Sequence, residues 1–84
     1  MLCFIYRSPK RDQMYLYVPN KEQFNEVPEQ LLNAFGVPDF SMMVDLSKRE
    51  NLAREDINKV RENMNSQGYH LQMPPNQESM LKQL

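Results

Sequence analysis

The sequence begins with MLCFIYR (Met1–Arg7), and the six residues before the arginine all carry apolar or aromatic side chains. Phe4, Ile5 and Tyr6 favour an extended backbone, so the stretch predicts a β-strand. Because apolar side chains stand at both odd and even positions, both faces of this strand should be buried. That pattern favours a sheet with helices on both faces, an α/β/α sandwich, over a two-layer plate with one wet face.

The chain then turns back as a predicted β-hairpin. SPKRD (8–12) supplies a proline and polar residues for the turn. MYLYV (14–18) resumes an alternating pattern, with Tyr15 and Tyr17 on one face and the other apolar side chains on the opposite face. The predicted hairpin tip gathers three cations: Arg7, Lys10 and Arg11.

A short helix and a third strand are predicted next along the chain. Pro28 suits the first helical turn and Gly36 suits the residue that follows a helix, so a helix is expected over 28–35. The alternation in FSMMVDL (40–46) predicts a strand with four apolar side chains on one side: Phe40, Met42, Val44 and Leu46. Most of the seven methionines are expected to fill the core.

The last part of the chain predicts the longest helix and a fourth strand. Apolar side chains near helical spacing run over 52–67, and Gly68 marks the stop. YHLQM (69–73) alternates, and the proline pair after it ends the strand because proline cannot donate to a ladder. The element order is therefore ββαβαβ, an α+β chain in one domain over 1–84, with room for a short C-terminal helix at 77–84.

The length, composition and net charge of the chain exclude several classes of protein. Eighty-four residues with 40% hydrophobic and 25% charged side chains suit one folded domain rather than two. A formal net charge of −1 gives no reason to expect a strong general attraction to nucleic acid or to anionic lipid. The single cysteine, Cys3, cannot form an internal disulfide, and the apolar start is too short to span a membrane. We therefore expect a cytoplasmic monomer that does not bind membranes.

No residue pattern in the sequence is typical of a catalytic or metal site. His70 is the only histidine, and no neighbouring spacing supplies the carboxylate and nucleophile that it would need. It falls on the polar side of its strand, so we expect a surface or edge-strand histidine. Cys3 is expected to be a buried structural thiol, and one histidine with one buried cysteine cannot fill a tetrahedral zinc site. The sequence therefore predicts no enzyme activity, cofactor or metal, and a hydrolase that uses His70 is the weakest hypothesis.

Two surfaces are the candidates for binding. At the hairpin tip, the three cations could hold a phosphate or carboxylate while Tyr6, Tyr15 or Tyr17 offers a stacking surface, as in sites for single-stranded nucleic acid. The same residues also suit a solvated turn in which Asp12 pairs with a neighbouring cation and the tyrosines cover the sheet. The sequence leaves both interpretations open. The second candidate surface follows the fourth strand and consists of three residues: Met73, Pro74 and Pro75.

Three separated motifs resemble those of a known family. They are IYRSPKRDQMYLYV (5–18), VPEQLLNAFG (27–36) and GYHLQMPP (68–75). Together they resemble the YcgL family of small bacterial proteins, found chiefly in gammaproteobacteria, over about residues 3–82. The resemblance implies an α/β/α sandwich of unusual topology, in agreement with the pattern above. It brings no catalytic residues that could be carried over onto this chain.

Two functional hypotheses of different classes follow. The first is a non-enzymatic protein-interaction or regulatory module that binds a protein partner, because the chain offers candidate surfaces and no catalytic constellation. The alternative is an accessory factor in RNA metabolism that contacts single-stranded nucleic acid through the basic hairpin tip. With only three cations, that binding should be weak and should fall steeply as salt rises.

Overall fold

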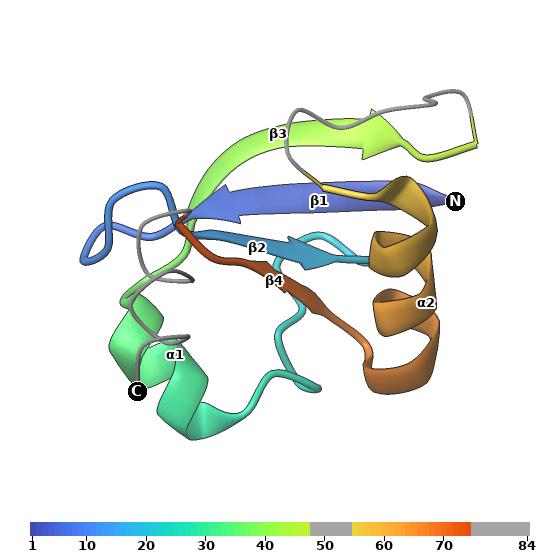
Figure 1. Ribbon diagram of the computed structural model, residues 1–84. Coiled ribbons are helices and arrows are strands. Elements are labelled where there is room, and N and C mark those ends of the chain that lie inside the picture. Colours follow the sequence, from blue (N-terminus) through green and yellow to red (C-terminus); the bar gives the residue numbers. More distant parts are fainter. Residues whose placement is uncertain (48–54, 75–84) are drawn as a thin grey trace, which may run out of the picture.

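The computed structural model describes residues 1–47 and 55–74, which form a four-stranded sheet and two helices (Figure 1). The elements follow in the expected order ββαβαβ: β1 (Leu2–Arg7), β2 (Tyr15–Val18), α1 (Glu29–Phe35), β3 (Asp39–Asp45), α2 (Ile57–Gln67) and β4 (His70–Gln72). The helix expected at 77–84 lies outside the described residues.

The sheet has the strand order β3-β1-β2-β4, and every neighbouring pair is antiparallel (Figure 1). The first strand is therefore internal, as its apolar sequence predicts. Ile5 is paired with Tyr17 of β2 on one side and with Met42 of β3 on the other. The two edges of the sheet are the seven-residue β3 and the three-residue β4.

Each face of the sheet has its own hydrophobic core, as the α/β/α prediction requires. Alternation along β1 sends Cys3 and Ile5 to the face covered by α2, and Phe4 and Tyr6 to the face covered by α1. The core on the α2 face contains eight buried residues: Cys3, Ile5, Tyr17, Val44, Leu46, Ile57, Val60 and Met64. The core on the α1 face contains six: Tyr6, Met14, Leu16, Val18, Val27 and Phe35.

Leu2 departs from the prediction that β1 is buried along its whole length on both faces. Its side chain is exposed. Leu2 is paired with Asp45 at the far end of β3, and α1 lies at the opposite end of the sheet (Figure 1). The helical layer on this face does not extend as far as the start of the strand, so an apolar residue there stays in contact with water.

Helix α2 begins five residues later than its apolar spacing predicts. Asp56 is the N-cap, and its side chain accepts a hydrogen bond of 2.9 Å from the Asn58 N–H. A capping carboxylate satisfies a donor that has no partner inside the helix, so it fixes the start. The predicted stop is confirmed: Gly68 has a left-handed φ of 87°, and its N–H bonds the Met64 carbonyl at 3.1 Å.

A β-bulge in β3 changes which face its side chains occupy. Ile5 and Tyr6 are consecutive in β1, yet their partners are Met42 and Phe40, so Ser41 is the extra residue. Phe40 therefore lies on the α1 face with Tyr6, and its predicted place beside Met42 and Val44 is wrong. The core role expected for most of the methionines is also wrong for Met42, which is exposed, and Met43 is exposed as well.

Candidate functional site

The hairpin tip, residues 8–14, is an ordered turn built around the buried hydroxyl of Ser8. The turn closes through a 3.0 Å hydrogen bond from the Ser8 N–H to the Met14 carbonyl. The Ser8 Oγ accepts hydrogen bonds from the Lys10 and Arg11 N–H groups at 3.2 and 2.9 Å. It also donates to the Phe35 carbonyl in the last turn of α1. One serine therefore sets the backbone of the tip and ties it to the helix.

Lys10 ties the tip to α1 a second time. Its Nζ donates to the Asn33 carbonyl at 3.1 Å. Carbonyls in the last turn of a helix lack intrahelical partners and carry the negative end of the helix dipole, so an ammonium is favourable there. The close approach needs Gly36, because a Cβ at this position would lie 3.0 Å from the Cγ atoms of both Lys10 and Pro9.

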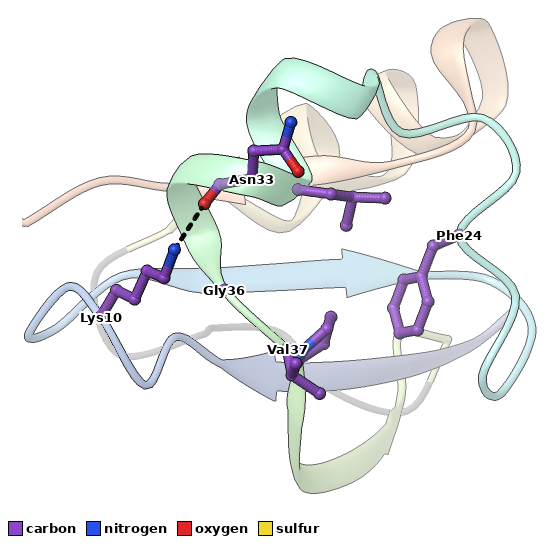
Figure 2. Close-up of a pocket in the computed structure, with 7 residues that line it drawn as sticks. Lys10, Phe24, Asn33, Gly36 and Val37 are labelled. Atoms are coloured by element: carbon purple, nitrogen blue, oxygen red, sulfur yellow. Dashed lines mark hydrogen bonds between the residues drawn. The ribbon is translucent and has the colours of Figure 1, made fainter.

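A pocket of about 390 Å³ opens where the tip, α1 and the loop after β2 meet, and we call it the tip pocket (Figure 2). Its lining consists of Lys10, Phe24, Leu32, Asn33, Gly36, Val37 and Pro38. Four of these side chains are apolar, and the Val37 side chain is unusually open to water, with 83% of the residue exposed. Such a pocket has the size and the apolar walls of a ligand site, with the Lys10 ammonium as its cation.

Phe24 is held in the pocket wall by the aromatic residues beneath it. Its ring meets the Tyr6 ring edge-on at 4.9 Å, and Tyr6 meets Phe40 in the same way at 5.5 Å. The Tyr6 hydroxyl accepts a 2.7 Å hydrogen bond from the Glu22 N–H, which fixes the loop that carries Phe24. Burial raises the pKa of the Tyr6 phenol, so the hydroxyl stays neutral in this contact.

The three cations of the hairpin, Arg7 at the end of β1 and Lys10 and Arg11 in the tip, have separate environments. Arg7 forms an exposed ion pair of 3.2 Å with Asp39 at the start of β3. Lys10 is directed to α1 and the tip pocket. The Arg11 guanidinium has no hydrogen bond or ion pair with any described residue, and Arg11 is exposed. The structure therefore gives these cations no common site.

Two of the three tyrosines predicted as stacking surfaces, Tyr15 and Tyr17, lie on the α2 face of the sheet, and Tyr6 is fully buried on the α1 face. Tyr17 is only 4% exposed, and its hydroxyl donates to the Gln72 Oε1 in the core. Its ring is therefore closed to a base, and the stacking role expected for it is wrong. Tyr15 is half-buried against the α2-side core. Neither side chain lines the tip pocket.

The candidate segment after β4 begins at the same end of the sheet as the tip. Gln72 is paired with Tyr15, and Tyr15 is paired with Arg7, the last residue of β1. Met73 and Pro74 are half-buried, and Met73 packs against the α1-side core. Pro75 lies outside the described residues. Met73 is therefore less open than the sequence suggests.

His70 is buried, and the expected surface position is wrong, although its strand is an edge strand as predicted. It is 5% exposed and packs edge-on against Tyr17 at 5.2 Å. Its Nε2 lies 3.1 Å from the Glu55 Oε1 and its Nδ1 lies 2.9 Å from the Asn63 Nδ2. A neutral ring with the proton on Nε2 satisfies both contacts, because it donates to the carboxylate and accepts from the amide.

This buried histidine has no arrangement suited to hydrolysis. Both ring nitrogens are engaged, and neither contact is with a serine or cysteine that could attack a substrate. Asp45 cannot face His70 across the sheet, because β3 and β4 are opposite edges. The same polar side of β4 carries Gln72, which is buried as well. The contacts hold α2 on the sheet.

Three further features of the described residues concern thiol chemistry, metal binding and membrane spanning. Burial raises the pKa of the Cys3 thiol to about 12, so it is a structural thiol and not a nucleophile. Within 1–47 and 55–74, metal-ligating side chains nowhere gather in a group of three or more. Neither α1 nor α2 has the length and hydrophobicity that a membrane span requires.

The tip pocket was not predicted from the sequence, although Lys10 was. Its walls come from a loop residue, a helix face and the segment 36–38, none of which carries reactive chemistry. The sequence feature that could have indicated the pocket is Val37, an apolar residue between Gly36 and Pro38 that belongs to no regular element. Only the folded chain shows that the neighbouring apolar side chains meet there.

Comparison with known proteins gives one consistent result. The family described as YcgL domain matches residues 3–75. The chain is 53% identical over 81 residues to YcgL domain-containing protein PMI1171 of Proteus mirabilis, covering 96% of this chain and 84% of that protein. It is 54% identical over 82 residues to YcgL domain-containing protein YE2368 of Yersinia enterocolitica, covering 98% and 91%. A YcgL domain-containing protein of Serratia proteamaculans is 54% identical over 83 residues, covering 99% and 92%. None of these names states an activity.

Proposed function

The chain belongs to the YcgL domain family, and we propose that it is a non-enzymatic protein-interaction module that holds an apolar side chain of a partner in the tip pocket. The observation that carries this proposal is the pocket itself: apolar walls, an exposed valine and one ammonium group at a site of about 390 Å³. A volume of this size accepts one large side chain with its neighbouring backbone.

The charge around the pocket defines the partner more closely. Lys10 keeps two of its three ammonium donors when one is used for the Asn33 carbonyl. Arg11 follows it in the chain and is exposed. A carboxylate next to the bound apolar side chain would pair with the Lys10 ammonium, which lines the pocket. We therefore expect a partner segment in which a large apolar residue stands beside Asp or Glu.

The alternative of single-stranded nucleic acid has less support from the same contacts. Stacking needs an open aromatic ring, and Tyr17 is buried. Arg7 is engaged by Asp39 and Lys10 by a helix carbonyl, so Arg11 is the one tip cation without a bond to the described part of the chain. A ligand that binds an apolar pocket and one or two cations fits a protein segment better than a phosphate backbone.

A photo-crosslinking experiment in cell extract tests the proposal. A photoreactive amino acid replaces Val37, which is exposed at the pocket, and in a control replaces Glu62 on the exposed side of α2. We expect a discrete protein adduct from position 37 and none from position 62. Adding Lys10→Ala should reduce that adduct by about fivefold, because the ammonium that would pair with the partner is gone.

The outcomes separate the two hypotheses. An adduct that protease destroys and ribonuclease leaves intact supports a protein partner. An adduct that ribonuclease destroys, and whose yield falls steeply with salt, would replace the proposal by the RNA alternative. Equal adducts from positions 37 and 62, or an adduct insensitive to Lys10→Ala, would remove the tip pocket from consideration.

A further inference from the structure

Within residues 1–47 and 55–74, no strand pairs with the outer edge of β3. Strand β3 is seven residues long, pairs with β1 on its inner side, and pairs with no described residue on its outer side. Its side chains between the two terminal aspartates are mostly apolar, and three of these apolar side chains are exposed: Phe40 and Met43 on the α1 face, Met42 on the α2 face. An open edge of this kind is a template for another strand.

The usual protection of an edge strand is weak along β3. Natural edges carry lysines, prolines or inward charges, or are very short. The central residues of β3 include no charge and no proline, and its one irregularity is the bulge at Ser41. The apolar side chains on either side of the ribbon could contact the alternate side chains of an added strand.

The two ends of β3 carry the charges that select the added strand. Asp39 at the start is exposed and pairs with Arg7, and Asp45 at the end lies 3.5 Å from the chain's terminal amine. Each carboxylate keeps acceptor capacity for a second cation. A second copy of the chain, paired antiparallel, would place an aspartate beside an aspartate at each end of the strand pair, and so would bring no cation to either carboxylate.

We propose that an extended segment of a partner protein, apolar at its centre and carrying Lys or Arg at both ends, adds beside β3 as a fifth strand of the sheet. The inference rests on the proposed role as a protein-interaction module but uses a surface other than the tip pocket. The cations should be about five positions apart, since the bulge at Ser41 leaves Asp39 and Asp45 opposite residues of β1 that are five positions apart, Arg7 and Leu2. Asp39 and Asp45 therefore lie on opposite faces of the sheet.

Short synthetic peptides test this strand addition by NMR with isotope-labelled protein. The first has the sequence Lys-Val-Thr-Val-Thr-Lys, with its lysines five positions apart and on opposite faces. The second has Glu at both ends, and the third has Pro in place of the second Val. We expect the first peptide to shift the amide signals of 39–45, the second to bind at least about fivefold more weakly, and the third not to bind.

Protein variants then assign the effect to the two aspartates. Asp39→Asn with Asp45→Asn should abolish the preference for the Lys-ended peptide over the Glu-ended one. Glu29→Gln with Glu62→Gln removes two charges from the helices and should leave the preference unchanged. Val37→Asp at the tip pocket should also leave it unchanged, so failure of the tip-pocket proposal is distinguishable from failure here.

Three results would overturn the inference. One is the absence of any shift in 39–45 with any peptide, and another is equal affinity for Lys-ended and Glu-ended peptides in wild-type protein at low salt. The third is a shift of the same signals with protein concentration alone, which would make a second copy the occupant. Added salt should weaken the Lys-ended peptide most, which provides a test that needs no variant.

Discussion

The two edge strands of the sheet, β3 and β4, differ in which of their side chains are buried and which are exposed to water. β4 has three residues, and its polar side chains His70 and Gln72 are buried and bonded under α2. β3 has seven residues, and its apolar side chains Met42 and Met43 are exposed. In each strand the side chains are placed against the simple expectation of apolar inside and polar outside.

The difference comes from where the helices lie, not from the strands themselves. α2 packs on β4 and β2, so it covers the polar side of β4 and supplies Asn63 as a partner for His70. The outer part of β3 receives no comparable cover from the described helices. Side chains therefore alternate between the two faces of a strand, and the position of the helices determines which face is buried.

The largest expected effect compares the centre of the sheet with the β3 edge. Ile5 and Met42 are direct partners on the same face, yet Ile5 is 6% exposed and Met42 is 48% exposed. Ile5→Ala should lower the free energy of unfolding by about 2–5 kcal/mol through lost burial and a residual cavity. Met42→Ala should cost less than about 1 kcal/mol because half of the side chain already contacts water.

Urea unfolding of the two variants measures both values. The contrast requires that the slope of free energy against urea is the same for both proteins, so that only stability has changed. If Ile5→Ala costs less than about 0.5 kcal/mol, β1 is peripheral and the α/β/α arrangement is wrong. If Met42→Ala costs as much as Ile5→Ala, the β3 edge is covered and the strand-addition inference loses its surface.

The second prediction concerns the buried polar side of β4. Tyr17→Phe removes the hydroxyl that donates to the Gln72 Oε1, and this leaves a buried acceptor without that bond. The expected loss of stability is about 1–2 kcal/mol. Tyr15→Phe, on the same strand and the same face but half-buried, should change stability by less than about 0.5 kcal/mol.

A second substitution identifies the cause of that loss. Gln72→Leu removes the orphaned acceptor, so the cost of Tyr17→Phe should be much smaller in the Gln72→Leu background than in wild type. Equal costs in the two backgrounds would mean that the hydroxyl acts through another partner, and that β4 is not held by this bond.

Much of the fold could be predicted from local patterns. The six apolar or aromatic residues at the start specified an internal strand, and Gly36 and Gly68 marked the ends of both helices correctly. The start of α2 was misplaced because apolar spacing continued past the cap at Asp56. The face of Phe40 was misassigned because a one-residue bulge reverses every alternation beyond it, and nothing in the local pattern marks Ser41 as the extra residue.

The candidate site could be predicted only in part, because it depends on contacts between distant segments. The basic tip was recognised, but the partners of its cations, Asp39 and the Asn33 carbonyl, are more than twenty residues away in sequence. Ser8 was taken as a turn residue, whereas its hydroxyl organises the tip. Such roles depend on tertiary geometry, which composition and periodicity do not contain.

The smallest expected effect is a pH dependence at the end of β3. Hydrogen bonds from the Ser47 hydroxyl and N–H lower the pKa of Asp45 below its ordinary value of 3.8, with a smaller contribution from the terminal amine. A carboxyl whose pKa is lower in the folded state stabilises the protein fully above its unfolded pKa. That stabilisation is lost as the pH falls through the folded pKa, because the unfolded chain then binds the proton more readily.

Asp45→Asn therefore should be less stable than wild type near about pH 6, and the difference should shrink in acid below the ordinary carboxyl pKa. Urea midpoints of both proteins across this range measure the change, and a carboxyl NMR titration of Asp45 locates its pKa directly. Ser47→Ala should move that pKa upward by removing the hydroxyl donor, whereas Ser41→Ala, on the same strand, should not. If the stability difference grows in acid instead, the ionised Asp45 carboxylate is not stabilised in the folded state by Ser47 and the terminal amine. The strand-addition inference would then lose one of its two aspartate charges.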